Sequence, residues 1–255
     1  TYHTANGYLG HCRLSIIDLA TGGQPMFSQD KNLVLVFNGE IYNYLEIKEE
    51  LSAQGYTFQT TSDSEVLLVG YQAWGENLVD HLRGMYAFVI YDVQNDQYYG
   101  ARDHFGIKPF YYYHGENSFI FASEAKAILK HPDYHLELDK ELLPLYLRFN
   151  YVPVDKTMFK GIHRLEAGTC FTYRQGRLSL RKYFRMEMTG EGTTKEEIQK
   201  TMKNSVDHHL LSDVKVGSFL SSGIDSSYLV SLSKVSDTYT IGYHEKKYSE
   251  LEYAK

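Results

Sequence analysis

The sequence contains little cysteine, proline or tryptophan and no long apolar run. Its 255 residues include two cysteines, five prolines and one tryptophan. Cys12 and Cys170 lie far apart and lack metal-ligand spacing, so we expect core or strand residues rather than a disulfide or a metal site. No apolar run approaches the roughly 18 residues of a membrane span, and the first residues lack the pattern of a signal peptide. We therefore expect a cytoplasmic protein with no membrane partner.

A strong charge of one sign is also missing. The formal net charge is −6, and no stretch is rich in lysine and arginine, so a nucleic-acid partner is not expected. The hydrophobic and aromatic fractions, 43% and 15%, suffice for one large domain or for one domain and part of another. The sequence begins without methionine and stops in what reads as the first turns of a helix, so we expect a fragment truncated at both ends.

Short runs rich in tyrosine, phenylalanine and valine dominate up to about residue 170. Helices are predicted after Asn43 and after Ser62, each with a glutamate three residues later, which is the spacing of a capping box. Gly55 and Gly75 should end these helices. Many strands with few helices favour stacked β-sheets with helices outside them. The apolar runs predict strands at 33–37, 85–92, 97–102, 110–114 and 118–123.

The pattern changes after about residue 185. Residues 186–194 are polar and contain glycine, which predicts a linker. We therefore expect one domain at 1–185 and a second, incomplete one at 195–255. The second domain is predicted to begin with a helix and then a β-α-β unit of a doubly wound sheet: helix 195–210, strand 215–220, a polar corner, helix 227–235 and strand 238–243.

The polar corner of the second domain has the sequence FLSSGIDSS and can bind a phosphate. A strand that leads through glycine and serine into a helix gathers backbone N–H groups and the positive end of the helix dipole at one point. Four serine hydroxyls add donors, whereas the lysine of a Walker A loop is absent. A serine-rich turn with Asp225 or Ser226 as helix cap explains the same residues, so the local sequence leaves both interpretations open.

The chain resembles two related families. SFLSSGIDSS is similar to the pyrophosphate-binding S-G-G-x-D-S loop of the ATP pyrophosphatase families, with Ser222 where glycine is usual. Eight further segments resemble glutamine-hydrolysing asparagine synthases of the bacterial class: GHCRLSIIDLATGGQPM, VFNGEIYNYLEIKEEL, TTSDSEVLLVGY, LRGMYAFVIYD, GARDHFGIKPFYYY, FASEAKAIL, HHLLSDVKVGSFLSSGIDSS and TYTIGYHEK. The resemblance covers nearly the whole chain. It implies an α+β fold: a four-layer αββα N-terminal-nucleophile hydrolase-like sandwich, followed by the first β-α-β of an adenine nucleotide α-hydrolase-like domain.

The motif VFNGEIYNY contains an Asn-Gly pair, which often forms a hairpin turn. A capped helix rather than a second strand is predicted to follow it, which weakens that interpretation. Alternatively, the Asn38 side-chain amide and the Gly39 N–H can stabilise the oxyanion that forms when an amide is attacked. The resemblance implies this catalytic role for both residues.

A glutamine pocket also needs a cation for the α-carboxylate and an anion for the α-ammonium. Arg13 suits the first role and Asp63 the second. Taken alone, Arg13 is better explained as a surface arginine at a strand start and Asp63 as an acid that complements a helix dipole. Matched to the family motifs, both become expected ligands, and the same pocket is expected to involve Glu40 and the backbone of Leu14, Ser15, Ile16 and Ile17.

The resemblance implies ATP with Mg²⁺ as cofactors, without a metal site made by protein ligands alone. The family's nucleophile is a cysteine at the mature N-terminus, and we expect that Cys12, Cys170 and Thr1 do not replace it. The adenine and pyrophosphate are expected to contact Phe219, Leu220, Ser221, Ser222, Gly223, Asp225, Ser226, Ser227, Ile241 and Gly242.

The implied reaction converts aspartate, glutamine and ATP into asparagine, glutamate, AMP and pyrophosphate, with ammonia passing between two sites. The expected partners are these small molecules, a homodimer is left open, and the isolated chain is expected to be inactive. Two alternatives stay open: a related ligase for another carboxylate in a surface-polysaccharide or antibiotic pathway, and a non-catalytic glutamine-binding module. The run RDHFGIKP (102–109) is expected to be a polar turn between strands rather than an acid–base pair.

Overall fold

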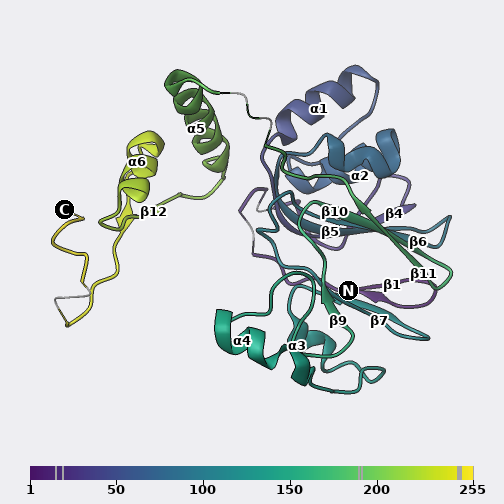
Figure 1. Cartoon of the computed structure of the whole chain (residues 1–255). Coiled ribbons are helices and arrows are strands. Elements are labelled where there is room, and N and C mark those ends of the chain that lie inside the picture. The colour runs from purple at the N-terminus through teal and green to yellow at the C-terminus, as the bar shows by residue number, and fades with distance from the viewer. Residues whose placement is uncertain (15, 19, 189, 191, 246–248, 255) are drawn as a thin grey trace. The chain divides into compact units, whose positions relative to one another are not determined.

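The computed structural model describes residues 1–14, 16–18, 20–188, 190, 192–245 and 249–254. The chain divides into two compact units, which are described separately (Figure 1). Unit 1 comprises Thr1–Leu14 and Ala20–Glu187, and unit 2 comprises Ser15–Leu19 and Met188–Lys255. The division after Glu187 falls within the expected linker, whereas the grouping of Ser15–Leu19 with unit 2 was not foreseen.

A six-stranded antiparallel sheet forms the centre of unit 1. The expected strands 85–92 and 97–102 are present, but the strand expected at 33–37 continues to Ile41. Asn38 and Gly39 therefore lie inside this strand, opposite Ala87 and Tyr86, and form no hairpin turn. The strand order is β11-β10-β6-β5-β4-β3, with β3 (Met26–Phe27), β4 (Leu33–Ile41), β5 (Gly84–Asp92), β6 (Gln97–Arg102), β10 (Thr169–Arg174) and β11 (Arg177–Lys182).

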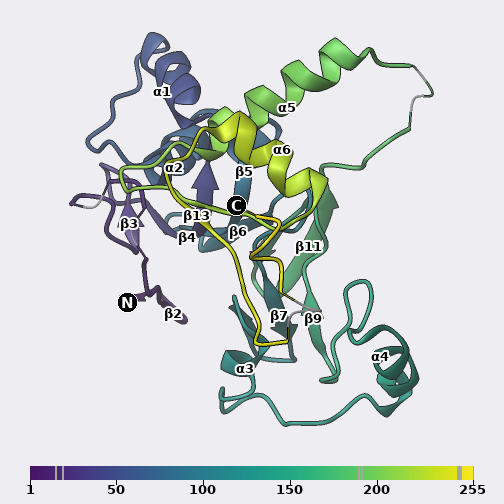
Figure 2. The same cartoon turned by 90° about the vertical axis from the view of Figure 1, so that its left-hand side faces the viewer.

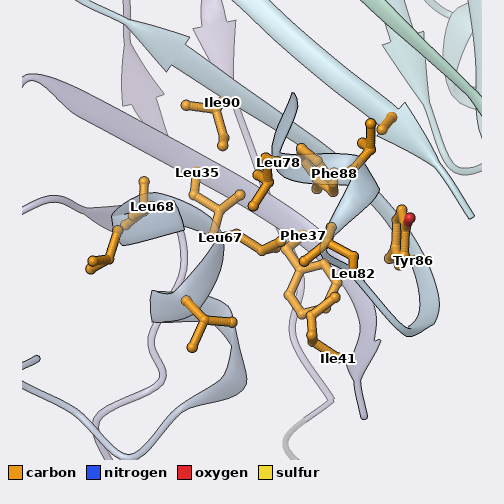
Figure 3. Close-up of a cluster of buried hydrophobic side chains, with 14 of the residues drawn as sticks. Leu35, Phe37, Ile41, Leu67, Leu68, Leu78, Leu82, Tyr86, Phe88 and Ile90 are labelled. Carbon is orange, nitrogen blue, oxygen red and sulfur yellow. The ribbon is translucent and has the colours of Figure 1, made fainter. Parts of the chain in front are cut away.

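Two helices, α1 (Tyr44–Ala53) and α2 (Asp63–Trp74), cover one face of this sheet (Figures 1 and 2). The 3-10 helix η1 (Gly75–Asp80) follows α2. Side chains alternate along a strand, so Leu35 and Phe37 of β4 face the helices while Val34 and Val36 face the other way. Figure 3 shows the resulting core, in which side chains of α2 and of the sheet interdigitate.

A smaller sheet of order β8-β7-β9 packs on the other face of the large sheet. Its strands are β7 (Tyr111–His114), β8 (Phe119–Ala122) and β9 (Ile162–Arg164). Tyr112 and Phe121 point toward the large sheet, whereas Tyr113 and Ile120 pack on the side of α3 (Ala125–Ile128). The layers are therefore helix, sheet, sheet and helix, and the expected αββα sandwich is confirmed. Unit 1 also contains β1 (Tyr2–His3), β2 (Tyr8–Leu9), η2 (Lys140–Leu142) and α4 (Leu143–Phe149).

The expected capping boxes of α1 and α2 are wrong. Asn43 precedes α1 but makes no side-chain cap; it accepts the Arg83 N–H instead (2.8 Å). Ser62 caps α2 by accepting the N–H two residues later, whereas the Glu65 carboxylate reaches out of the helix to the Thr60 N–H (2.7 Å). The side chains of Asn43 and Glu65 therefore hold neighbouring loops instead of capping the helices. Those loops bring unpaired N–H groups close to the helix starts.

The segment 102–109 is a polar turn, as expected. Asp103 is fully buried and accepts the backbone N–H groups of Phe105 and Ile107 (3.1 and 2.9 Å) through one carboxylate oxygen. The other oxygen accepts those of Lys108 and Tyr86 (2.9 and 3.3 Å). The acid thus organises backbone between β6 and β7, and four donors account for its burial.

Unit 2 contains α5 (Lys195–His209), β12 (Ser218–Phe219), α6 (Ile224–Ser233) and β13 (Thr238–Tyr239). The two strands pair in parallel, with Ser218 opposite Thr238, so the expected β-α-β connection is present. The strands are shorter than expected, α6 begins three residues earlier than the expected 227, and the residues 251–253 form a turn rather than a helix. Across the described part of the chain, no helix has both the length and the apolarity to cross a bilayer.

Candidate functional site

The candidate site lies along the outer edge of β4, the edge that faces away from β5. The N–H and C=O groups of Tyr86, in β5, point away from β4. The Tyr86 C=O accepts the Asp103 N–H (2.8 Å), and the Tyr86 N–H donates to the Asp103 carboxylate (3.3 Å). Gly39 is directly opposite Tyr86. The pair is therefore a non-hydrogen-bonded one, and the Gly39 N–H points outward from β5. Phe37 and Ile41, two residues away on either side, have the same orientation.

Two side chains from outside the sheet occupy this edge on either side of Gly39. The Phe37 N–H donates to Gln24 Oε1 (2.6 Å), and Gln24 Nε2 donates to the Phe37 C=O (2.9 Å). The Asp63 carboxylate accepts the Ile41 N–H (3.0 Å). Within the described ranges, the Gly39 N–H has no hydrogen-bond acceptor. An unoccupied donor therefore lies between two occupied ones.

The backbone at Gly39 leaves no room for a side chain. Its φ is +155°, and a Cβ atom would lie 2.7 Å from Tyr86 Cα and still closer to the Met85 carbonyl oxygen. The close approach of β4 and β5 therefore requires glycine here. The same close approach holds the Gly39 N–H in a fixed direction.

Asn38 faces the space between the two sheets. Even-numbered residues of β4 point toward the small sheet, as the burial of Val34 and Val36 shows, and Asn38 follows this alternation. It lines a cavity of about 90 Å³ together with His11 and Ser123. Its side chain thus points toward the small sheet, whereas the N–H of the adjacent Gly39 points in the plane of the large sheet, away from β5.

Opposite charges meet at the same edge. Asp63, at the start of α2, is 4% exposed; burial and the nearby Glu40 raise its pKa to about 6, while the Ile41 N–H and Arg13 act in the opposite direction. The guanidinium of Arg13 lies beside Gly22, where a Cβ atom would be 2.8 Å from Arg13 Cζ. Asp63 is therefore not a solvated acid at a helix terminus, and Arg13, which lies in no strand, is not a surface arginine at a strand start.

Of the other predicted glutamine ligands, the structure places Glu40 close to Asp63. Glu40 is buried on β4 and acts electrostatically on Asp63. The Leu14 side chain is 87% exposed. Ile16 and Ile17 belong to unit 2, where the Asp213 N–H donates to the Ile16 C=O (3.1 Å), and Ser15 lies outside the described residues. The roles of Leu14 to Ile17 stay predictions.

The serine-rich corner of unit 2 connects β12 to α6. The hydroxyls of Ser221 and Ser226 are hydrogen-bonded to each other (2.7 Å), and Ser226 and Ser227 donate to the Gly223 C=O (3.0 and 2.9 Å). Ser222 donates to the Glu250 carboxylate (3.3 Å). Most of these hydroxyls therefore satisfy loop backbone, as in a serine-rich turn, and phosphate binding would require them to rotate.

The substitution of serine for the usual glycine is compatible with this corner. Ser222 does not have a positive φ, so its backbone conformation does not require glycine. The Leu220 N–H donates to the Tyr239 C=O (2.9 Å), which joins the corner to the parallel strand pair. Asp225, Phe219 and Ile241 are exposed. Their roles in nucleotide binding, and that of Gly242, stay predictions.

Both cysteines are free. Cys170 is 2% exposed in the core between the large sheet and its helices; burial raises the pKa of its thiol, which makes it a poor nucleophile. Cys12 is exposed and lies in no strand, contrary to expectation. In the described ranges, no group of three or more His, Cys, Asp and Glu side chains could hold a metal ion.

Sequence reasoning overlooked Gln24 and His11. The Gln24 side-chain amide bonds to the N–H and C=O of Phe37, as the backbone of a neighbouring strand would. Nothing in GGQP indicates which backbone groups this amide contacts. His11 lies two residues before Arg13, so in an extended segment both side chains lie on one side. That spacing was the available signal.

Comparisons with known proteins match both parts of the chain to glutamine amidotransferase and asparagine synthase proteins. A family model for the glutamine amidotransferase domain matches residues 1–184, and one for asparagine synthase matches residues 197–255. Asparagine synthetase [glutamine-hydrolyzing] 1 of Bacillus subtilis is 42% identical over 100% of this chain and 42% of its own length. Asparagine synthetase B [glutamine-hydrolyzing] of Escherichia coli is 36% identical over 91% of this chain and 38% of its own length.

The chain thus spans about two fifths of the length of these curated relatives. Among solved structures, a glutamine phosphoribosylpyrophosphate amidotransferase from B. subtilis aligns with 88% of this chain and 50% of its own, at 20% identity and a TM-score of 0.44.

Proposed function

The chain belongs to the glutamine amidotransferase domain family, with an asparagine synthase segment after that domain, and from this premise we propose that unit 1 binds L-glutamine at the outer edge of β4. Arg13 holds the α-carboxylate and Asp63 the α-ammonium. The Gly39 N–H and the Asn38 amide approach the side-chain carboxamide. The observation that carries this proposal is the unoccupied Gly39 N–H between the Gln24 and Asp63 contacts.

These groups suit the chemistry of amide cleavage. When a nucleophile attacks a carboxamide, its oxygen becomes negative, and two fixed donors stabilise that charge. Removing one such donor typically costs about 3 kcal/mol of barrier. Because β5 leaves no room to move Gly39, its N–H needs no reorganisation when the charge develops.

For a complete protein we propose glutamine-dependent asparagine synthesis from aspartate and ATP, with release of AMP and pyrophosphate. The corner of unit 2 would hold the pyrophosphate through the backbone N–H groups at the start of α6 and through the hydroxyls of Ser221, Ser222, Ser226 and Ser227. Bound Mg²⁺ would offset phosphate charge there. The related ligase for another carboxylate differs only in its acceptor.

We further propose that this chain binds glutamine without hydrolysing it. Cys170 is enclosed in the core, and its raised pKa disfavours the thiolate. The expected result of an ammonia-release assay is no turnover. Turnover that Asn38→Ala and Cys12→Ser both abolish would contradict this proposal and would identify Cys12 as the nucleophile; loss with Asn38→Ala alone would direct attention to Thr1.

Isothermal titration calorimetry with L-glutamine tests the binding site. Arg13→Ala and Asp63→Asn should each weaken binding at least about tenfold, since each removes one charge-assisted contact worth about 1.5–3 kcal/mol. Arg177→Ala, at an exposed position of β11, is the matched control and should bind as the wild type does. An undetectable wild-type interaction, or equal affinities in all four proteins, would refute the glutamine site.

A further inference from the structure

His11 has a buried nitrogen without a partner at the proposed site. The backbone of Phe37 acts on the ring and raises the pKa of His11, in opposition to burial and to Arg13. One ring nitrogen, Nδ1, is buried and has no hydrogen-bond partner in the described part of the chain. Because Nδ1 has no partner, we assign the interaction with Phe37 to Nε2. Buried polar atoms in native proteins are nearly always paired, so an unpaired one requires an explanation.

The interaction assigned to Nε2 determines whether Nδ1 donates or accepts a hydrogen bond. A backbone carbonyl accepts a hydrogen bond, so Nε2 carries the hydrogen, and Nδ1 of the neutral ring is then an acceptor. Burial, and secondarily the Arg13 guanidinium, lower the pKa of His11. The ring is accordingly neutral near pH 7, and Nδ1 presents a lone pair.

The surroundings of His11 contain a suitable space. The cavity of about 90 Å³ that Asn38 lines is also lined by Gly10, His11, Phe110, Ala122 and Ser123. It exceeds the volume that one water needs, about 10–15 Å³, and is large enough for a small planar group. Asn38 and His11 therefore offer a donor and an acceptor at one small cavity.

We propose that His11 Nδ1 accepts a hydrogen bond from the carboxamide NH₂ of the ligand, and that His11 thereby selects a carboxamide over a carboxylate. The inference rests on the proposed function and deepens it. A carboxamide presents an acceptor oxygen to Asn38 and Gly39 and an N–H donor to His11. A carboxylate has only acceptor oxygens, so one of them would face the Nδ1 lone pair. Sites built to bond an N–H discriminate strongly against analogues that lack it.

The experiment compares L-glutamine with L-glutamate by calorimetry in four proteins. The wild type should prefer glutamine by about 100-fold, the difference expected when a buried acceptor loses its donor. His11→Phe keeps a flat ring but lacks the acceptor, so the preference should fall to within about fivefold. His11→Asn, whose amide oxygen can replace Nδ1, should recover part of it. Arg13→Ala should weaken both ligands and leave their ratio unchanged.

A second measurement separates this inference from the glutamine site itself. Propionamide has no α-charges, so its contact with His11 does not depend on Arg13 or Asp63. In the ¹⁵N-labelled wild type, propionamide should shift the His11 Nδ1 resonance, whereas propionate should not. That result supports the inference even if glutamine does not bind, in which case only the proposed function is wrong.

Two outcomes would overturn the role of His11. One is a glutamine preference that His11→Phe leaves unchanged; the other is an Nδ1 resonance that propionamide does not move or that carries a hydrogen in the free protein. Loss of glutamine affinity in Arg13→Ala would still support the proposed function in either case. If His11→Phe does not fold, as judged by the fluorescence of the single tryptophan, the propionamide titration of the wild type decides.

Discussion

The helices of the two units were equally visible in the sequence but differ in packing. In unit 1, α1 buries Ile47 and Leu51, and α2 buries most of its residues. In unit 2, neither α5 nor α6 has a buried residue. The large sheet explains the difference, because a six-stranded face can cover two helices whereas a pair of two-residue strands cannot. Hydrophobic burial therefore stabilises the first pair, and local capping contributes more to the second.

The two candidate sites differ in a related way. At the edge of β4, side chains from separate segments converge on a strand whose position β5 fixes. At the corner of unit 2, hydroxyls bond mainly to the backbone of their own loop. The first arrangement is pre-organised for a ligand, whereas the second must reorganise to bind one. Four predictions test or sharpen this comparison, from the largest expected effect to the smallest.

Gly39→Ala should destabilise unit 1 by about 4 kcal/mol, because the added Cβ meets the backbone of β5 and the φ of +155° suits only glycine. Urea unfolding followed by the fluorescence of Trp74 measures this effect in unit 1. Gly55→Ala is the matched control: it also has a positive φ, +93°, but no atom lies within 4 Å of its Cβ position, so it should cost about 1 kcal/mol. Equal costs would show that β5 does not constrain Gly39.

Leu67→Ala should cost about 3 kcal/mol, because this α2 side chain is 0% exposed in the core. Ile198→Ala, in α5, should cost less than about 0.5 kcal/mol, because Ile198 is 49% exposed. Thermal unfolding by circular dichroism, with Trp74 fluorescence for unit 1, measures both. A cost at Ile198 as large as that at Leu67 would contradict the difference in packing.

Asp63→Asn should stabilise unit 1 at neutral pH and leave it little changed at acid pH. The pKa of Asp63 is raised from 3.8 to about 6 on folding, so between these values the folded state holds a proton that the unfolded state has released. Wild-type stability therefore falls as pH rises through this window, by about 2–3 kcal/mol, and asparagine removes the loss. Urea midpoints at pH 4 and pH 7.5 measure it.

If the urea midpoints of Asp63→Asn and the wild type differed by the same amount at both pH values, this pH effect on stability would be contradicted. In the wild type, glutamine affinity should fall below about pH 6, because a protonated Asp63 no longer pairs with an ammonium. The same substitution is thus expected to improve stability and to impair binding.

Thr194→Ala should remove about 1 kcal/mol from α5 alone, because Thr194 and Glu197 form a capping box at its start. Far-ultraviolet circular dichroism should report a loss of helix at lower temperature, while the Trp74 transition stays unchanged. Ser205→Ala, inside the same helix, is the control and should not lower helicity. A shift of the Trp74 transition would show that the two units unfold together.

The sequence by itself determined the class of the protein and the order of its main elements. Runs rich in tyrosine, phenylalanine and valine at 85–92 and 110–114 predicted strands, and the resemblance of the ordered motifs implied an αββα sandwich followed by a β-α-β unit. It also placed Arg13, Asn38, Gly39 and Asp63 in one functional hypothesis. These features depend on local periodicity and on motif order, which a linear chain carries directly.

Only the tertiary structure decided which backbone groups stay open. The alternation of N–H groups along β4 is a property of any strand, but the open position at Gly39 arises because Gln24 and Asp63, from distant segments, occupy the positions on either side. The capping boxes are absent for the same reason, because the side chains of Asn43 and Glu65 accept backbone N–H groups of Arg83 and Thr60 instead. A polar group bonds to the partner that folding brings within reach, and sequence spacing does not specify that partner.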